Sequence, residues 1–182
     1  MINVYAEVES AKYFHHKDLE KALTRALKKT STWLKAESVR VLGRELEIRA
    51  GAWRKRIKVN RIDKDTGGIW IGINDLNLAY VRDYHQTATG VVSGDNYYHK
   101  AFAQVMSGNR ELIWRRTGER RKVSNPYAKR SPNGIRKWRK SPPVEIVREE
   151  IADEVEAYTK RGDLERRTIE YFKEAFINEL YQ

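Results

Sequence analysis

Helical periodicity at both ends of the chain limits the folds that it can adopt. Apolar residues recur three or four positions apart over residues 17–42 and again over residues 144–180, which is the spacing of one helix face. The first stripe predicts one long helix and consists of Leu19, Leu23, Ala26, Leu27, Thr30 and Leu34. The second stripe starts directly after Pro143, a residue typical of a first helical turn, and Gly162 either bends it or divides it into two helices in series.

Short runs of alternating apolar and polar residues fill the middle of the chain and predict β-strands. Residues 56–62 and 69–73 alternate with period two, and the Asp- and Gly-rich residues between them are typical of a turn, so the two runs predict a hairpin. Residues 2–9 alternate in part, as a first strand or an ordered arm. Further expectations are strands at 90–93, 100–105, 111–116 and 120–123, a turn at 117–119, a short helix at 50–55, irregular chain at 74–84 and a loop at 124–143.

These elements predict an α+β fold with a long N-terminal helix, a small, mostly antiparallel β-sheet or sandwich, and a long C-terminal helix. The length of 182 residues suits one ordinary domain. We expect residues 1–143 to form that domain, with a basic loop at residues 115–143. Residues 144–182 are expected to pack on the same domain as a C-terminal helical segment.

Positive charge is concentrated in one part of the sequence. The chain has a formal net charge of +11, and residues 110–140 hold twelve arginines and lysines against two acidic residues, whereas residues 144–182 are net acidic. Such asymmetry indicates DNA, another anionic partner or an acidic face of another subunit. The residues expected to make this contact are Arg110, Arg115, Arg116, Arg120, Arg121, Lys122, Lys129, Arg130, Arg136, Lys137, Arg139 and Lys140.

The sequence offers little for catalysis. Cysteine is absent, which excludes disulfides, a thiolate nucleophile and cysteine metal sites. The four histidines lack metal-ligand spacing, and Asp63 and Asp65 flank a Gly-Gly turn in which aspartate is common for conformational reasons. We therefore expect no enzyme, no catalytic or metal residues and no cofactor. No apolar run reaches 18 residues and the first residues do not follow the pattern of a signal peptide, so no membrane partner is expected.

A motif in and beside the basic region resembles a known family. The sequence reads AFAQVMSG at residues 101–108 and LIWRRTG at residues 112–118, and it continues with further basic residues and a proline-containing loop. This order is similar to that of the minor tail protein Z family of long-tailed phages and prophages, a group of tail completion proteins. The surrounding layout is similar as well: a long N-terminal helix, a basic hairpin region (WRKRIKV), a Gly-Val strand (GVVSG) and a final helix.

The resemblance implies a virion protein at the head-proximal end of a tail, assembled in the host cytoplasm. Such a protein acts after tube polymerisation and makes the tail competent to join a head. The resemblance also implies a ring of copies, six by expectation, next to tail tube, tail terminator or head-connector proteins. In such a ring the basic residues could meet the acidic C-terminal helix of a neighbour, or DNA phosphates in the channel without reading sequence.

Two other functions stay open at this point. The alternative is a stand-alone, sequence-nonspecific nucleic-acid-binding protein that uses residues 110–140. Aromatic residues near that segment could stack on bases, but they are equally common in protein interfaces: Tyr97, Tyr98, Trp114, Tyr127 and Trp138. A nuclease is the least favoured function, because no convergent set of carboxylates or histidines is visible.

Overall fold

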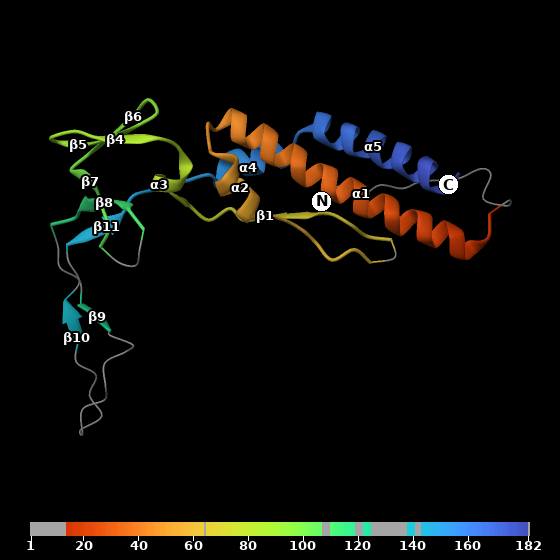
Figure 1. The fold of residues 1–182 in the computed structure, drawn as a ribbon, viewed down its shortest axis with the longest axis horizontal. Coiled ribbons are helices and arrows are strands. Elements are labelled where there is room, and N and C mark those ends of the chain that lie inside the picture. Colours follow the sequence, from red (N-terminus) through yellow and green to blue (C-terminus); the bar gives the residue numbers. More distant parts are fainter. Residues whose placement is uncertain are drawn as a thin grey trace, which may run out of the picture. The chain divides into compact units, whose positions relative to one another are not determined.

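The computed structural model describes residues 14–63, 65–106, 110–118, 122–124, 138–140 and 143–181, the two three-residue stretches by their backbone alone. It confirms the α+β class: a long N-terminal helix, small antiparallel sheets and a long C-terminal helix (Figure 1). The chain forms two compact units, which do not follow the expected division at residue 143. Residues up to Asp75 and from Glu150 onward form a helical unit, and Leu76–Glu149 form a β unit.

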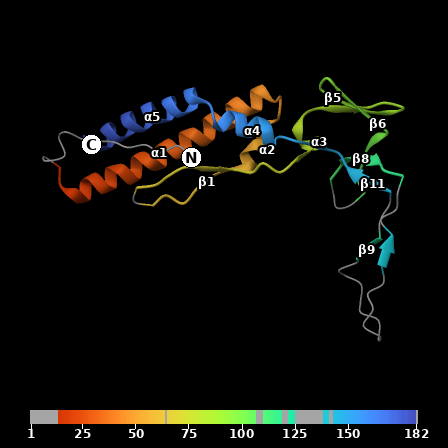
Figure 2. The same ribbon diagram turned by 180° about the vertical axis from the view of Figure 1, so that it is seen from behind.

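Two antiparallel helices make up most of the helical unit. Helix α1 (His16–Glu45) and helix α5 (Gly162–Leu180) lie side by side in both views of Figures 1 and 2. Two ion pairs show that the helices run in opposite directions. Arg25 of α1 pairs with Glu179 near the end of α5, and Glu45 at the end of α1 pairs with Arg161 just before α5. The apolar stripes of both helices meet in a core of Ala22, Ala26, Phe172, Ala175 and Phe176. The predicted first stripe is therefore a core-facing surface.

The second stripe is only partly helical. Helix α4 (Ala152–Thr159) is followed by α5, so two helices in series are confirmed. The expected helix start after Pro143 is wrong, because Val144–Ile146 form strand β11 and Arg148–Glu149 form strand β12. Residues 144–146 also alternate apolar and polar side chains, and pairing with a neighbouring strand satisfies the backbone of β11.

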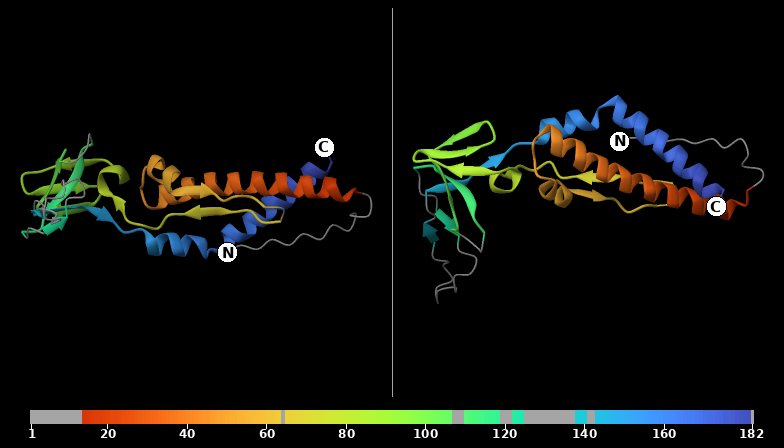
Figure 3. Two further views of the ribbon diagram at one scale, coloured as in Figure 1. Left: turned by 90° about the horizontal axis from the view of Figure 1, so that it is seen from below. Right: turned by 45° about the horizontal axis from the view of Figure 1, so that its top comes forward.

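A short helix and a hairpin complete the helical unit. Helix α2 (Ala50–Arg56) leads into strand β1 (Ile57–Val59), which pairs antiparallel with β2 (Ile69–Ile71), so both the predicted helix and the predicted hairpin are confirmed. Both views of Figure 3 show the hairpin along α1. Ile57 is fully buried, whereas the opposite face of the hairpin is open to solvent.

The β unit begins and ends with one strand pair. Strand β3 (Leu76–Asn77) pairs with β12, and the short helix α3 (Leu78–Val81) follows β3, so the expectation of irregular chain at 74–84 is wrong. One sheet has the order β4 (Tyr84–Gln86), β5 (Gly90–Ser93) and β6 (Asn96–His99). A second sheet has the order β11, β8 (Leu112–Arg116) and β7 (Ala101–Gln104). The core between these elements consists of Leu78, Ala79, Val91, Ala101, Ile113 and Val147.

The partner of β8 differs from the one that the sequence predicts. Residues 120–123 were expected to return against residues 111–116, but β8 pairs with β7 and β11. Strand β9 (Lys122–Ser124) pairs instead with β10 (Trp138–Lys140), inside the segment expected to be a loop. Gly118 has a positive φ of 79°, and the Thr117 N–H donates to the Pro143 carbonyl at 2.8 Å. The turn at Gly118 directs the chain away from β8, so residues 120–123 do not return along it. The hydrogen bond from Thr117 to Pro143 brings β11 to the free edge of β8.

No helix in the described part of the chain is long and apolar enough to cross a membrane.

The helix–helix core makes a direct prediction about stability. Phe172 is 2% exposed and stacks on Phe176, so Phe172→Ala should lower the free energy of unfolding by about 3–4 kcal/mol through lost burial and a cavity. The matched control is Ile177→Ala on the same helix, which is 53% exposed and should change stability by less than about 0.5 kcal/mol. Urea unfolding followed by far-UV circular dichroism measures both variants. Equal effects would show that α5 does not bury this face against α1.

Candidate partner interface

Strand β8 carries Arg115 and Arg116, two residues of the basic segment 110–140. Phe102 and Ile146 lie opposite Trp114 on the neighbouring strands, and all three side chains are half-buried. The Trp114 indole N–H donates to the Gln104 carbonyl at 2.9 Å, which fixes the ring on this face. The other face of the sheet is buried in the core of the β unit through Ile113. The basic residues at the end of β8 are therefore held by a strand that is anchored on both sides.

The two arginines at the end of β8 have different surroundings. The Arg115 guanidinium donates twice to Glu145 Oε1, at 3.2 and 3.1 Å, across the β8–β11 pair. Arg116 lies over the Phe102 ring, 5.6 Å from its centre, and is exposed. A carboxylate balances the charge of Arg115 inside the fold, whereas the side-chain contact that the described residues make with Arg116 is an aromatic face.

Lys100 joins this end of the sheet, although the sequence did not predict it as a contact residue. Its backbone carbonyl accepts the Arg116 N–H at 3.4 Å, and its φ of 57° marks the sharp turn from β6 into β7. Tyr97 lies in the preceding strand, is 50% exposed, and is hydrogen bonded to Thr89 Oγ1 at 2.6 Å. Lys100 and Arg116 thus form an exposed basic pair with an exposed aromatic residue nearby in sequence.

The remaining predicted contact residues are not gathered at this point. Arg110 is exposed, but it precedes β8 and so lies at the opposite end of the strand from Arg116, about 20 Å away by strand geometry. Strands β9 and β10 bring three basic positions together, because Lys140 lies opposite Lys122 and Arg139 is next to it. The other predicted positions lie outside the described residues: Arg120, Arg121, Lys129, Arg130, Arg136 and Lys137.

A partly buried ion pair joins the two segments near the start and the end of the β unit. Arg82, directly after α3, donates to Glu149 of β12 at 2.5 Å, and the two side chains are 13% and 21% exposed. Burial raises the pKa of the neighbouring Tyr98, and the nearby Glu149 charge adds to this shift. Removing one partner of a pair with so little solvent access destabilises a fold far more than removing one partner of an exposed pair. It therefore holds the entry and exit strands of the unit together.

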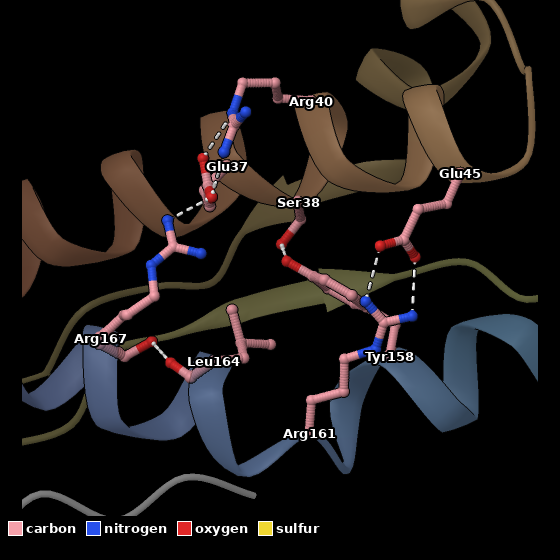
Figure 4. A network of polar contacts seen from close by, with 9 residues as sticks. Glu37, Ser38, Arg40, Glu45, Tyr158, Arg161, Leu164 and Arg167 are labelled. Atoms are coloured by element: carbon pink, nitrogen blue, oxygen red, sulfur yellow. Dashed lines mark hydrogen bonds and ion pairs between the residues drawn. The ribbon is translucent and has the colours of Figure 1, made fainter.

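A second polar cluster lies in the helical unit (Figure 4). Glu37 of α1 accepts hydrogen bonds from Arg40, at 2.9 and 2.7 Å, and from Arg167 of α5. These arginines lower the pKa of Glu37 to about 2, with Arg40 as the larger cause and burial opposing it. Because each recorded charge in the cluster has an opposite charge beside it, we interpret Glu37 as a clamp between two helices and not as an acid or base.

Two further contacts extend the same clamp. The Tyr158 hydroxyl of α4 donates to Ser38 Oγ at 3.1 Å, and burial raises its pKa. The Arg161 guanidinium donates to both oxygens of Glu45 at 2.7 Å, an arrangement that fixes direction as well as distance. Figure 4 shows that the contacts of Tyr158, Arg161 and Arg167 cross from the α4–α5 segment to α1. The cluster therefore sets how the C-terminal helices lie on α1.

The described residues were also searched for a metal-binding group and for hollows on the surface. Within those ranges, no group of three or more histidine, aspartate or glutamate residues could hold a metal ion. A hollow between α1 and α2 is open to solvent, and its only charged lining residues are Arg40 and Arg54. A second open hollow, on α5, is lined by both acidic and basic side chains, among them Glu165, Glu170 and Lys173.

Comparisons with known proteins return nothing for this chain: no family model matches it, and neither does any curated protein or solved structure.

The Glu37 clamp predicts how stability depends on pH. Its folded pKa of about 2 lies below the ordinary value of 4.5, so its contribution is complete above about pH 4.5 and is lost as the pH falls toward 2. The free energy of unfolding should therefore fall over this range by on the order of 2 kcal/mol more in the native chain than in Glu37→Gln. The control Glu154→Gln removes an exposed carboxylate and should keep the native slope. Urea unfolding at pH 5, 4, 3 and 2 tests this, and equal slopes in all three proteins would contradict the clamp.

Proposed function

We propose that this chain is a structural protein of a tailed-phage virion, a tail completion protein at the head-proximal end of the tail. One observation supports the proposal most directly. The two halves of the motif that resembles the minor tail protein Z family lie on β7 and β8, which are paired antiparallel with Phe102 opposite Trp114. The residues that carry the resemblance thus come together in one structural element of this chain.

The distribution of charge supports an assembly of copies. The basic pair of Lys100 and Arg116 is exposed on the β unit, whereas helix α4 begins with the exposed acids Asp153 and Glu154 in the helical unit. A ring subunit needs different, complementary surfaces for its two neighbours. In the proposed ring of six copies, the basic residues of one copy meet the acidic helices of the next, or line the channel and contact DNA without reading its sequence.

The proposed surroundings follow from the same role. Above and below the ring lie the tail tube, the tail terminator or the head-connector proteins, and the ring assembles in the host cytoplasm before it becomes part of the virion. The role is structural and not enzymatic, and it needs no cofactor.

A second candidate function is a stand-alone nucleic-acid-binding protein. The specific observation in its favour is the exposed aromatic ring of Tyr97, near Lys100 in the sequence, together with the exposed Arg116. Aromatic and basic groups in one place can stack on bases and neutralise phosphates. This candidate requires neither a ring nor an acidic protein surface.

The mass of the particle in solution distinguishes these two functions. Light scattering would be recorded at low and at physiological salt, with and without duplex DNA. The tail proposal predicts a monomer or a ring whose mass DNA does not change at physiological salt. Tight binding to DNA by an isolated monomer, weakening steeply as salt increases, would contradict it and favour the second candidate.

Charge reversal tests the basic segment within the virion. Changing Arg115, Arg116, Arg120 and Arg121 to glutamate should block assembly without unfolding the chain, because the two described arginines are exposed and the Arg115–Glu145 pair is half-exposed. The control changes four exposed basic residues of the helical unit to glutamate, Lys28, Arg44, Arg54 and Lys55, and gives the same net charge. Infectivity in the phage that encodes the chain and the thermal unfolding of both variants are measured. Normal infectivity of the first variant would contradict the proposal.

A further inference from the structure

One face of the β1–β2 hairpin carries an exposed aromatic ring beside a lysine. Trp70 and Lys58 lie directly opposite each other in the strand pair, so their side chains share a face and their Cα atoms are about 5 Å apart. The Trp70 side chain is 53% exposed, and Lys58 is exposed as well. The other face of the hairpin includes the fully buried Ile57 and packs against α1 (Figure 3). The face with Trp70 is therefore turned away from the core of the helical unit.

The glycine at position 72 determines how the Trp70 ring lies. A Cβ atom on Gly72 would be 2.8 Å from Cη2 and 3.1 Å from Cζ3 of Trp70, so the far end of the ring occupies the space of a side chain. Positions 70 and 72 point to the same face and are about 7 Å apart along a strand, which means that the ring leans along β2. One side of the ring then lies over the strand, and the other side is open to solvent.

Hydrogen bonds fix the chain beneath the ring. The Gly72 N–H donates to the Arg56 carbonyl at 3.0 Å. The Arg56 guanidinium donates to the carbonyls of Asn74 and Asp75 at 2.9 and 3.1 Å, and its Cδ lies 3.5 Å from the Cβ position of Gly72. The stem of Arg56 thus lies beside the Trp70 ring while its charged end holds the chain after β2. The support of the ring is formed within the fold, which lowers the entropic cost of binding a partner.

The strand beside the ring is strongly basic. Residues 54–61 contain five arginines and lysines and no acidic residue. Four of the five are exposed: Arg54, Lys55, Lys58 and Arg61. The acidic residue that follows them, Asp63, lies outside both strands and is 3.9 Å from Arg61. The hairpin therefore places an open aromatic face within a region of positive charge, a combination that suits an anionic partner with a flat group of its own.

We propose that this face of the hairpin binds single-stranded nucleic acid, with a base stacked on Trp70 and the adjoining phosphates beside Lys58. A nucleotide joins a flat ring to a negative charge, which is the combination that this face complements. An acidic protein segment supplies carboxylates but no flat group to cover the indole. A duplex keeps the faces of its bases stacked on one another, so the ring selects for a single strand.

The proposed site differs from the basic segment in ligand and in place. Every residue used here belongs to the helical unit, whereas residues 110–140 follow the first strands of the β unit. Each base has an aromatic face and each nucleotide has a phosphate, so binding at this site does not depend on the base sequence. The inference goes beyond the proposed tail function and does not rest on it, because it requires neither a ring of copies nor the basic segment.

Binding of fluorescently labelled oligothymidylate and oligouridylate, each about 15 nucleotides long, to the full chain tests the proposal by fluorescence anisotropy. Trp70→Ala should weaken the binding of at least one of them about tenfold through lost stacking, whereas Trp70→Phe keeps a ring and should weaken it less than about threefold. The matched control Tyr97→Ala removes a ring of similar exposure from the β unit and should leave the affinity unchanged. Far-UV circular dichroism and thermal unfolding check that the variants fold.

Three outcomes of this experiment would overturn the proposal. The first is that the native chain binds neither oligonucleotide. The second is that Trp70→Ala binds both as tightly as the native chain does. The third is that Tyr97→Ala loses as much affinity as Trp70→Ala, because the stacking would then not be specific to the hairpin.

Charge provides a second test. Lys58→Gln should reduce the slope of log affinity against log salt concentration by about 0.7, the value for one phosphate contact on a single strand. The control Lys28→Gln makes the same change of charge at an exposed position of α1 and should keep the native slope. Unlabelled duplex DNA should also compete less well than the single strand for the native chain, and this difference should shrink in Trp70→Ala. Equal slopes in the two lysine variants, or an unchanged difference in Trp70→Ala, would contradict the proposed site.

Discussion

The antiparallel packing of α1 against α5 is the interaction on which the helical unit depends. Its apolar part is made of small residues on α1 and aromatic rings on α5, so that Phe172 fills the space beside Ala22 and Ala26. An apolar stripe alone permits one helix to slide along the other. The Glu37–Arg167 and Glu45–Arg161 pairs remove that freedom, because each bond can form in only one register. The core supplies the stability, and the charged pairs select the alignment.

The β unit is inserted into the helical unit between residues 75 and 150, and a strand pair and a partly buried ion pair close it. The chain enters through β3 and leaves through β12, which are hydrogen bonded to each other. Arg82 and Glu149 add charge to this closure with little access for solvent. Because both ends of the insertion are joined in this way, the sheets of the β unit fold around a core of their own.

The sequence predicts the elements whose pattern is local. It does not predict an element whose conformation depends on pairing with a strand far away in the sequence. Helix α1 and the β1–β2 hairpin follow from periodicity and turn residues within about 30 positions. Strand β6 was missed although Gly94 and Asp95 form a two-residue turn signal between β5 and β6. Residues 144–149 fit either a helix or a strand, and pairing with β8 selects the strand. The same limit applies to predicting the candidate site. Arg115 and Arg116 are adjacent in the sequence, yet Glu145, thirty positions away, pairs with Arg115.

The choice of partner for β8 also determines how the basic segment is presented. A local hairpin with residues 120–123 would place the arginines along the edge of a sheet, next to its hydrogen-bonding groups. The structure instead gives that edge to β11, and the Thr117–Pro143 hydrogen bond joins the two ends of the segment between them. The segment thus leaves and re-enters the sheet at one point, beside Arg116 and Lys100. Because β7 and β11 pair with β8 on its two edges, the pairing of β8 does not depend on the residues between Gly118 and Pro143.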